Sequence, residues 1–431
     1  MRTHLGRVFF FTGDPAEAGA EALCFYERGA LVVDGEGRVA AAGPADALSG
    51  MIGATEVTDH GDAYICPGFV DCHIHFPQAV SAASFGGKLL DWLSRHIYRN
   101  EEAFADRAFA QSQAEGLFSA MLASGTTSAA LYGSVHEAAV DELFSVALSR
   151  NQRVCAGKML MDRNLPEGVT RDTPESATAA TERLIGRWHG KGRLCYAVSP
   201  RFAVAASDKL LQACGEILAR HPNVLCQTHV SENPDEAALV ARLFPGSGSY
   251  LSVYQSFELL GPRTVLGHAI HFTEEDFALA AQTGAVLVSC PDANFLLGSG
   301  VFDWAAARKA GVRLGLGSDV GAGSSLCMLA IAREALKASM MGKGGLDVLS
   351  AWYLITLGNA RALGWGERIG SFAPSREADF VVLSPEKPPL LPLRMAQALS
   401  VPERLAALLL LGNEATVHKT FILGRQVQGP A

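Results

Sequence analysis

The amino-acid sequence predicts an α/β protein in which a TIM-like (β/α)₈ barrel is joined to a small β domain built from both ends of the chain. Three observations support this fold class. Eight apolar, strand-like runs follow one another along the middle of the chain, helical patterns separate many of them, and both ends are rich in short strands and turns. With 431 residues, 49% of them hydrophobic, the chain is long enough for such a barrel and an appended domain.

The eight strand-like runs are expected to form one parallel sheet, because strands that alternate with helices are joined by crossover connections. They lie at residues 63–72, 126–132, 153–161, 193–200, 223–230, 264–272, 285–290 and 312–317. Helical patterns occur at residues 102–123, 135–149, 174–189, 208–220, 235–244 and 274–282. An open doubly wound sheet is the alternative, but no GxGxxG segment follows the early strands.

The two ends of the chain have a different character from the middle. Residues 29–43 hold two apolar runs separated by Asp34-Gly35 and Glu36-Gly37, which is typical of a β-hairpin. Residues 378–383 and 420–427 are also strand-like, with turn residues around them. We therefore predict a composite β domain from residues 1–66 and 370–431, and a barrel from residues 67–369.

Composition excludes several classes of protein. The formal net charge of −8 argues against a general affinity for nucleic-acid phosphates. No apolar segment is long enough to cross a bilayer or resembles a signal peptide. The nine cysteines form no CxxC pair and sit mostly in apolar runs, as expected in a reducing compartment. We therefore expect a cytoplasmic protein with neither a nucleic-acid nor a membrane partner.

Ionisable residues stand where several predicted strands end, which is the face of a TIM barrel that carries function. The first strand ends in His73 and His75, the fifth in His229, the sixth contains His268, and Asp319 follows the eighth. In a strand, residues i and i+2 point to the same side, so His73 and His75 aim two imidazoles at one point and suit a metal. Two hydrogen-bonded histidines at the barrel mouth are the alternative for an isolated His-x-His.

The acidic residues each allow a functional and a structural interpretation. Glu232 follows His229 by three residues and suits general acid–base work, but a glutamate at a helix start is also favoured by the helix dipole. Asp319 suits a metal ligand that also takes a proton, but Asp-x-Gly is a common turn sequence. The segments HExxH, GxxxxGK[ST], GxSxG and PCxxC with HxE are all missing from the sequence, which argues against four other enzyme types.

The order of these residues resembles that of the amidohydrolase superfamily. The segment Pro67-Gly68-Phe69-Val70-Asp71-Cys72-His73-Ile74-His75 is followed by His229, His268 and Asp319. More narrowly, the chain is similar to the guanine deaminase family over nearly its whole length. The specific segments are His75-Phe76-Pro77-Gln78, Leu89-Leu90-Asp91-Trp92-Leu93 and Pro200-Arg201-Phe202-Ala203.

The resemblance implies a reaction and a set of residues for it. The reaction is hydrolytic deamination of guanine to xanthine and ammonia with one divalent metal, zinc first and Fe²⁺ as the alternative. The implied ligands are His73, His75, His229 and Asp319. Glu232 is implied to shuttle protons, Asp319 to accept the proton of the water, and His268 to position that water. Gln78, Arg201 and Phe202 are implied to recognise the purine base, with Leu90 and Trp92 packing nearby. The resemblance also implies a β-sandwich built from both termini and a homodimer.

Two departures from the family pattern bear on the substrate. The family commonly has His-Gly where this chain has His268-Ala269, and a Pro-Thr-Ser-Asn-like segment where it has Pro291-Asp292-Ala293-Asn294. The extra carboxylate of Asp292 near the barrel mouth could change which base is accepted. A deaminase or dechlorinase acting on another aminopurine such as 8-oxoguanine, on a triazine or on a pyrimidine therefore remains an alternative. A catalytically inactive barrel used as a binding scaffold is a second one, and the presence of all four implied ligands argues against it.

Overall fold

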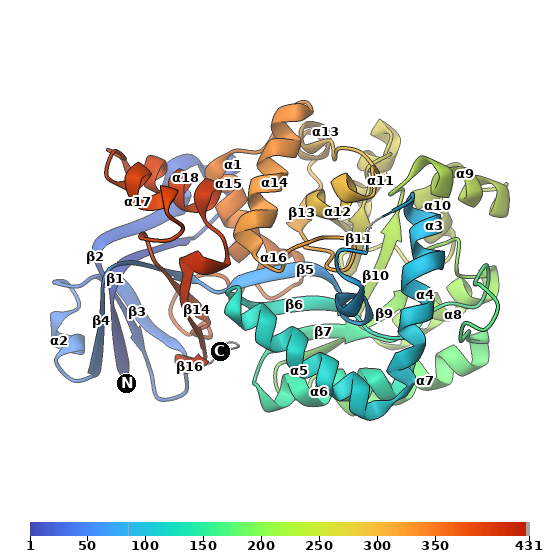
Figure 1. Cartoon of the computed structure of the whole chain (residues 1–431), viewed down its shortest axis with the longest axis horizontal. Coiled ribbons are helices and arrows are strands. Elements are labelled where there is room, and N and C mark those ends of the chain that lie inside the picture. Colours follow the sequence, from blue (N-terminus) through green and yellow to red (C-terminus); the bar gives the residue numbers. More distant parts are fainter. Residues whose placement is uncertain (85, 428–431) are drawn as a thin grey trace.

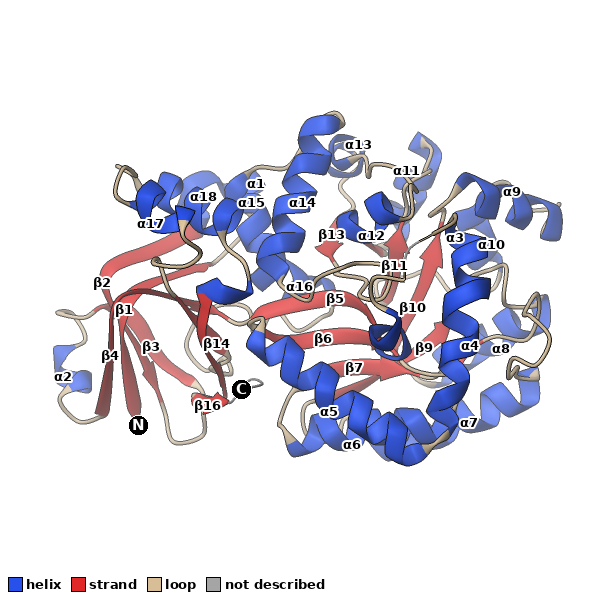
Figure 2. Ribbon diagram, viewed as in Figure 1, coloured by secondary structure: helices blue, strands red, loops and turns tan. Residues whose placement is uncertain are grey.

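A computed structural model describes residues 1–84 and 86–427 of the chain. Its larger part is a nearly closed barrel of parallel strands, shown in the right half of Figures 1 and 2. The strands pair in the order β13-β12-β11-β10-β9-β7-β6-β5, and β8 (Met159–Leu160) pairs only with β9. Their bounds are β5 Phe69–His75, β6 Thr126–Tyr132, β7 Arg153–Gly157, β9 Leu194–Pro200, β10 Leu225–Val230, β11 Thr264–His268, β12 Val286–Ser289 and β13 Arg313–Leu316. The predicted barrel is confirmed.

Helices between the strands cover the outside of the barrel (Figure 2). The larger ones are α5 Arg107–Ala123, α6 Glu137–Ser149, α7 Pro174–Trp188, α8 Asp208–Arg220, α9 Pro234–Leu243, α10 Tyr250–Ser256, α11 Glu274–Thr283 and α14 Met328–Met341. Shorter ones are α3 Leu89–Trp92, α4 Tyr98–Glu101, α12 Pro291–Leu296, α13 Trp304–Lys309, α15 Val348–Tyr353 and α16 Asn359–Ala362. Among the described residues, every helix is too short or too polar to cross a membrane.

Side chains close the barrel where its first and last strands meet. The pairing order of the described strands ends at β5 on one side and β13 on the other. Asn359 bridges them, because its Nδ2 donates to the carbonyls of Val70 (2.6 Å) and Leu316 (2.8 Å) while its Oδ1 accepts from the amide of Leu316 (2.8 Å). The buried carboxylate of Asp71 accepts from the amides of His73 and Ser318, each at 3.0 Å. These hydrogen bonds join β5, which carries His73 and His75, to the loop that carries Asp319.

Strands from both ends of the chain form a second, mixed sheet, seen on the left of Figure 1 as blue and red strands side by side. Its order is β16-β15-β14-β4-β1-β2-β3. The bounds are β1 Arg2–Phe11, β2 Leu23–Val33, β3 Val39–Pro44, β4 Glu56–Pro67, β14 Phe380–Leu383, β15 Val417–Ile422 and β16 Arg425–Val427, with the short helices α1 Pro15–Ala18 and α2 Ser49–Ile52 between the early strands. The hairpin expected within residues 29–43 is the β2–β3 pair, in which Val33 faces Val39. The composite β domain is thus confirmed, while its exact boundaries at residues 66 and 370 stay a prediction.

The run at residues 63–72 was expected to be one strand, and the structure divides it between the two sheets. The chain leaves the terminal sheet at Pro67 and enters the barrel at Phe69, with Gly68 between them. A Cβ atom on Gly68 would lie only 2.3 Å from Thr127 Oγ1, so the backbone can pass this point only with glycine. The sequence does not show this break, because the residues on both sides of Gly68 are buried and apolar residues continue across it.

Residues 384–416 hold helices where the sequence suggested only strands and turns. The helices α17 (Leu390–Met395) and α18 (Val401–Leu411) lie between β14 and β15, and α18 packs on α14 and α15. The signal for α18 was present, because Ser400 and Glu403 form a capping box before an apolar run. The strand-like runs at residues 378–383 and 420–427 led us to expect only strands and turns in this part of the chain.

The terminal sheet contains a histidine whose surroundings disfavour its charged form. His4 on β1 meets the stacked rings of Phe380 and Phe421 edge-on, at centroid distances of 4.8 and 4.9 Å, and its Nδ1 is 3.1 Å from Nε2 of His60. Burial lowers the pKa of His4 to about 4, and the nearby positive charges of His60, Arg2 and Lys419 act in the same direction. The folded protein therefore holds His4 neutral at pH values where the unfolded chain would protonate it.

Replacing His4 by Leu is expected to make the protein less sensitive to mild acid. Between about pH 6.5 and pH 4 the unfolded chain binds more protons at this position than the folded chain, so stability falls as pH falls. At pH 5 this linkage lowers the free energy of unfolding by about 1–2 kcal/mol relative to pH 7. In His4→Leu, urea unfolding at the two pH values should differ by that much less than in the parent protein. His418→Leu, on the exposed part of β15, is the matched control; an equal effect there would contradict the assignment.

Candidate metal centre and active site

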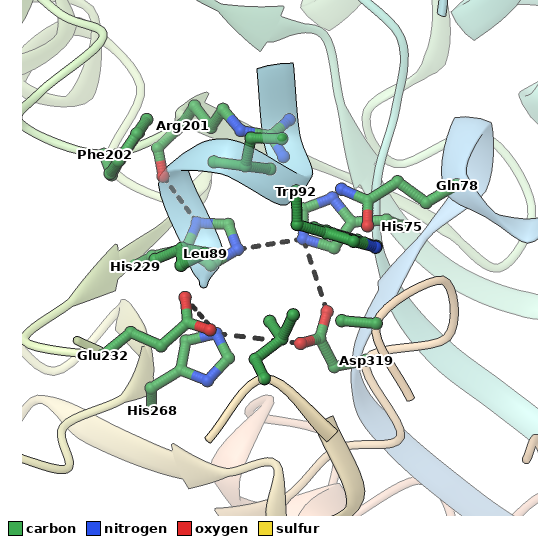
Figure 3. Close-up of a pocket in the computed structure, with 13 residues that line it drawn as sticks. His75, Gln78, Leu89, Trp92, Arg201, Phe202, His229, Glu232, His268 and Asp319 are labelled. Carbon is green, nitrogen blue, oxygen red and sulfur yellow. Dashed lines mark hydrogen bonds and ion pairs between the residues drawn. The ribbon is translucent and has the colours of Figure 1, made fainter. Parts of the chain in front are cut away.

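The carboxyl ends of the barrel strands bring the predicted residues together, and Figure 3 shows His75, His229, His268 and Asp319 among them. His73 and His75 end β5, His229 lies near the end of β10, His268 ends β11, and Asp319 follows β13. All five are buried. Gly267 makes room for this cluster, because a Cβ atom there would lie 2.6 Å from Cε1 of His73. Residues that are far apart in the sequence thus share one small volume.

Three of the histidines form a group with the geometry of a metal site. His73, His75 and His229 each offer a ring nitrogen, and these three atoms lie within 4.8 Å of one another. Nε2 of His75 and Nε2 of His229 face each other at 2.9 Å, and Asp319 Oδ1 is 3.5 Å from His73 Nε2 and 3.6 Å from His75 Nε2. Both ring nitrogens of His73 and Nδ1 of His75 are buried without a hydrogen-bond partner among the described residues. Nitrogens left in this state fit a cation better than they fit a protein interior.

The electrostatics of the three imidazoles also suit a metal. Burial lowers the pKa of His73, His75 and His229 well below its usual value, and the other histidines and Arg201 lower it further. The rings are therefore neutral and keep a lone pair for a ligand bond. Nδ1 of His229 faces the carbonyl of Arg201 at 2.5 Å, which orients the ring so that Nε2 points into the cluster. Three nitrogens and one carboxylate oxygen are a donor set that a divalent metal of the zinc type accepts.

A second set of donors overlaps the first. His73, His268, Cys290 and Asp319 also lie within 4.8 Å of one another through their ligand atoms. From the sequence, Cys290 is interpreted as a small buried hydrophobic residue, and no motif indicates that it borders the cluster. Burial raises the pKa of the Cys290 thiol well above its usual value, and the carboxylates of Asp319 and Asp71 raise it further. The candidate metal site therefore comprises His73, His75, His229, His268 and Asp319, with a protonated thiol beside it.

Two carboxyl groups flank the cluster in surroundings that hinder ionisation. Glu232 Oε2 is 3.4 Å from Nε2 of His268, and Asp319 Oδ2 is 3.8 Å from the same nitrogen. Burial raises the pKa of Glu232 well above its usual range, and the carboxylates of Asp319 and Glu236 raise it further. Burial also raises the pKa of Asp319 to about 6. Carboxyl groups tuned in this way can take and give protons near neutral pH.

The backbone that presents Glu232 is held by a second buried glutamate. Glu232 lies in the turn between β10 and α9, and the preceding Ser231 has a φ of +47°. Glu236 Oε2 accepts from the amides of Glu232 (2.9 Å) and Asn233 (3.1 Å), and its Oε1 accepts from the hydroxyl of Tyr250 (2.7 Å). Sequence reasoning missed Glu236, although Asn233 and Glu236 have the spacing of a capping box.

A small cavity opens beside the cluster, and most of the predicted substrate-binding residues line it. Gln78, Trp92, Arg201 and Phe202 do so, as Figure 3 shows. Apolar side chains complete the wall: Leu89, Leu93, Leu297 and Ala322. Leu89 lies in this wall and Leu90 is not among its lining residues, so a role for Leu90 beside the substrate stays a prediction. Consecutive residues of a helix point about 100° apart, so a sequence segment cannot show which of two leucines faces inward.

Among the described residues that line this cavity, Arg201 is the one arginine or lysine. It is buried, its guanidinium lies 5.4 Å from the ring centroid of Tyr98, and its Nη1 has no hydrogen-bond partner among the described residues. By contrast, the indole Nε1 of Trp92 donates to the carbonyl of Ser84 at 2.6 Å, so only the apolar part of this ring is available. The cavity therefore combines a flat apolar wall with an unsatisfied cationic donor.

The extra carboxylate of Asp292 lies near the barrel mouth, beside the loop that follows Asp319. Asp292 Oδ2 accepts from the amide (2.6 Å) and the hydroxyl (2.9 Å) of Ser324, and Asp292 is not among the residues that line the cavity. It ties α12 to the loop after Asp319. Ala269 is fully buried and also stays outside the cavity lining. Neither departure from the family pattern puts a new group into the cavity.

Comparisons with known proteins agree with this geometry. The model of the amidohydrolase family matches residues 64–427. The guanine deaminase of Escherichia coli (strain K12) is 37% identical over 417 residues, which cover 96% of this chain and 94% of that protein. The structure of guanine deaminase from Bradyrhizobium japonicum superposes with a TM-score of 0.94 at 33% identity, covering 100% of this chain and 99% of that one.

A further structure in the comparison contains a ligand. Guanine deaminase from C. acetobutylicum, with guanine bound in its active site, matches with a TM-score of 0.89 at 25% identity over 99% of both chains. Sequence, fold and site thus agree along essentially the whole length. The chain belongs to the amidohydrolase family and, within it, to the guanine deaminases.

Proposed function

We propose that the protein hydrolyses guanine to xanthine and ammonia with the help of one divalent metal. The C2–O bond forms from water, the bond between C2 and the exocyclic nitrogen breaks, and the amino group leaves as ammonia. The observation that supports this most directly is the position of Arg201, whose unsatisfied Nη1 belongs to the same cavity wall as His75, His229 and Asp319. The relative from C. acetobutylicum, which binds guanine in its active site, supports the same substrate.

The residues proposed to hold the metal are His73, His75, His229 and Asp319. Zinc is the proposed metal, because a set of three imidazoles and a carboxylate suits its tetrahedral preference, and Fe²⁺ is the alternative. Such a metal, when bound, lowers the pKa of water from about 15.7 towards 7 and supplies a nucleophile at neutral pH.

The proton transfers are proposed for Asp319 and Glu232. Asp319 accepts the proton that the attacking water loses. Glu232, whose pKa is raised by burial, donates a proton to the purine ring nitrogen and then assists the leaving amino group. His268 stands between the two carboxyl groups and positions the water.

Base recognition is proposed for the other wall of the cavity. A guanidinium has donors only, so Arg201 suits the carbonyl oxygen O6 of guanine and disfavours the amino group that adenine carries there. The side chain of Gln78 can both donate to and accept from the base edge. Phe202 and Trp92 supply apolar faces for a planar ring.

The experiment that tests the proposal is ammonia release from a panel of bases, with metal stoichiometry measured on the same sample. Guanine, 8-oxoguanine, adenine, cytosine and ammeline cover the competing deaminase activities. We expect guanine to give the highest kcat/KM and about one metal ion per chain. Another base preferred over guanine would change the substrate assignment, and metal-free protein without activity on any base would favour a scaffold.

Arg201→Met should weaken guanine turnover without removing the metal. The variant keeps the length of the side chain but loses the charged donor, and a hydrogen bond to a charged group contributes about 1.5–3 kcal/mol. We therefore expect kcat/KM for guanine to fall by roughly 10- to 100-fold, with unchanged metal content. Arg163→Met is a matched control, because Arg163 also lies on an aromatic ring, that of Phe244, but outside the cavity lining. Equal guanine kinetics in Arg201→Met and the parent protein would refute the role.

We also propose that the protein is a cytoplasmic homodimer. Leu390 and Leu393 on α17 and the nearby Leu399 expose 64%, 68% and 94% of their surface, which is typical of a contact region. Light scattering in solution should give twice the 45.6 kDa of one chain. A monomer at micromolar concentration would contradict this proposal without affecting the catalytic one.

A further inference from the structure

We propose that Asn294 is a positioning residue that fixes the tautomer and the orientation of His268. The inference builds on the proposed function, since it concerns the histidine that stands between the two proton-transferring carboxyl groups. It gives a task to the segment Pro291-Asp292-Ala293-Asn294, for which the sequence suggested only a possible effect on base choice.

The contact itself is short and buried. Asn294 lies on α12, directly after β12, and its Oδ1 is 2.9 Å from Nδ1 of His268. Both side chains are 1% exposed. The helix end is held in place as well, because the amide of Ser299 donates to the carbonyl of Asn294 at 2.8 Å. The amide oxygen therefore reaches His268 from a fixed point of the backbone.

This contact decides which nitrogen of His268 carries the proton. An amide oxygen can only accept, so Nδ1 of His268 must be the donor, and the neutral ring keeps its lone pair on Nε2. Nε2 is the atom that faces Glu232 at 3.4 Å and Asp319 at 3.8 Å. A lone pair at that position can accept from water or from a protonated carboxyl group, or serve a metal. With the other tautomer, Nε2 would present a hydrogen to the same groups.

The orientation of the ring also depends on Asn294. His268 has a φ of +73° and the following Ala269 a φ of +52°, a backbone conformation that residues other than glycine rarely adopt. The rings of His73 and His229 lie at 5.4 Å from that of His268, and His229 stacks on it at 20°. Stacking alone leaves a ring free to flip by half a turn, which would exchange the two nitrogens. The hydrogen bond to Asn294 removes that freedom.

The amide of Asn294 has no other evident task. Its Nδ2 is buried without a hydrogen-bond partner in residues 1–84 and 86–427, and His268 is the single partner of its Oδ1 there. An unsatisfied buried amide hydrogen is costly, and a purely structural role would not require it. Because ligand-orienting partners of this kind typically change activity or metal affinity by 10- to 100-fold, the effect should be measurable.

The test combines kinetics with a tautomer measurement on zinc-loaded protein. Asn294→Leu removes the acceptor at similar size, Asn294→Ala serves if the leucine variant folds poorly, and Asn294→Asp keeps an acceptor oxygen. In ¹⁵N-histidine-labelled protein, NMR distinguishes a protonated Nδ1 from a protonated Nε2, and His268→Asn assigns the signals. Gln152→Leu is the control, because it removes a buried amide that has no partner within residues 1–84 and 86–427 and stands before β7, at the opposite end of the barrel.

We expect Asn294→Leu to lose the Nδ1–H signal of His268 and to lower kcat for guanine by about 10- to 100-fold, with KM nearly unchanged. Asn294→Asp should keep both the signal and most of the activity, and Gln152→Leu should change neither. An unchanged tautomer in Asn294→Leu, or an equal loss of kcat in the Leu and Asp variants, would overturn the inference. The NMR readout needs no substrate, so a parent protein inactive on guanine would refute the proposed function alone.

Discussion

Replacing Glu232 by Gln is expected to lower kcat for guanine by about 10²- to 10⁴-fold, the usual contribution of a general acid–base group. Gln has the shape of Glu but cannot carry a proton to the ring nitrogen. The proposed ligands His73, His75 and His229 are untouched, so the metal content should stay at its parent value. Steady-state kinetics and metal analysis of the same preparation measure the two effects separately.

The pH profile of this variant gives a second, independent readout. Burial raises the pKa of Glu232, so the fraction of ionised carboxylate falls as pH drops through that raised value. Because the protonated form donates in the proposed step, kcat/KM should fall as pH rises through that raised value, above the usual titration range of a glutamate. That limb should vanish in Glu232→Gln and persist in Glu275→Gln, an exposed glutamate on α11. Undiminished turnover in Glu232→Gln would remove Glu232 from the mechanism.

The sequence predicts the barrel and its polar end well because both follow from local periodicity. Buried parallel strands appear as short apolar runs, and in a parallel barrel all their carboxyl ends meet at one face. The sequence therefore predicts that His73, His75, His229, His268 and Asp319 lie together. The hairpin of β2 and β3 was equally local, because its turn residues lie between two apolar runs.

What the sequence could not predict depends on contacts between distant segments. Asn359 closes the barrel through one hydrogen bond to Val70, 289 positions away, and two to Leu316, 43 positions away. No local sequence pattern indicates this role. Asn294 and Glu236 contact the proposed catalytic residues through single side-chain atoms. Cys290 borders the cluster only because β12 lies beside β11. Each of these roles comes from tertiary packing and not from spacing along the chain.

Which of Leu89 and Leu90 faces the cavity could not be predicted for a related reason. Both residues belong to a short helix above the barrel mouth, and the direction of that helix is set by neighbours such as the Trp92–Ser84 contact. Periodicity gives the relative positions of side chains around a helix, but not the rotation of the helix as a whole.

Removing the metal should abolish turnover and also destabilise the fold. Without a cation, the ring nitrogens of His73 and one of His75 are buried and have no partner in the part of the chain that the structure describes, and Asp319 is a buried carboxyl group. A ligand that binds only the folded state at about 1,000 times its Kd raises the free energy of unfolding by about 4 kcal/mol. Dialysis against a chelator followed by addition of zinc should therefore lower and then restore both kcat and the denaturation midpoint. Magnesium should not replace zinc, because imidazole nitrogens do not suit it.

The stabilisation by zinc should weaken in acid, and the pKa of Asp319 predicts where. Metal binding needs the ionised carboxylate, and burial raises the pKa of Asp319 in the metal-free protein to about 6. Above pH 6 the group is already ionised, whereas below it each pH unit costs binding about 1.4 kcal/mol, because a proton must first leave. The imidazoles do not compete in this range, since burial lowers the pKa of His73, His75 and His229 well below 6.5. In Asp319→Asn, zinc should stabilise the protein less at pH 7.5, and the loss between pH 6 and pH 5 should disappear. A zinc effect independent of pH in the parent protein would show that Asp319 is not a ligand.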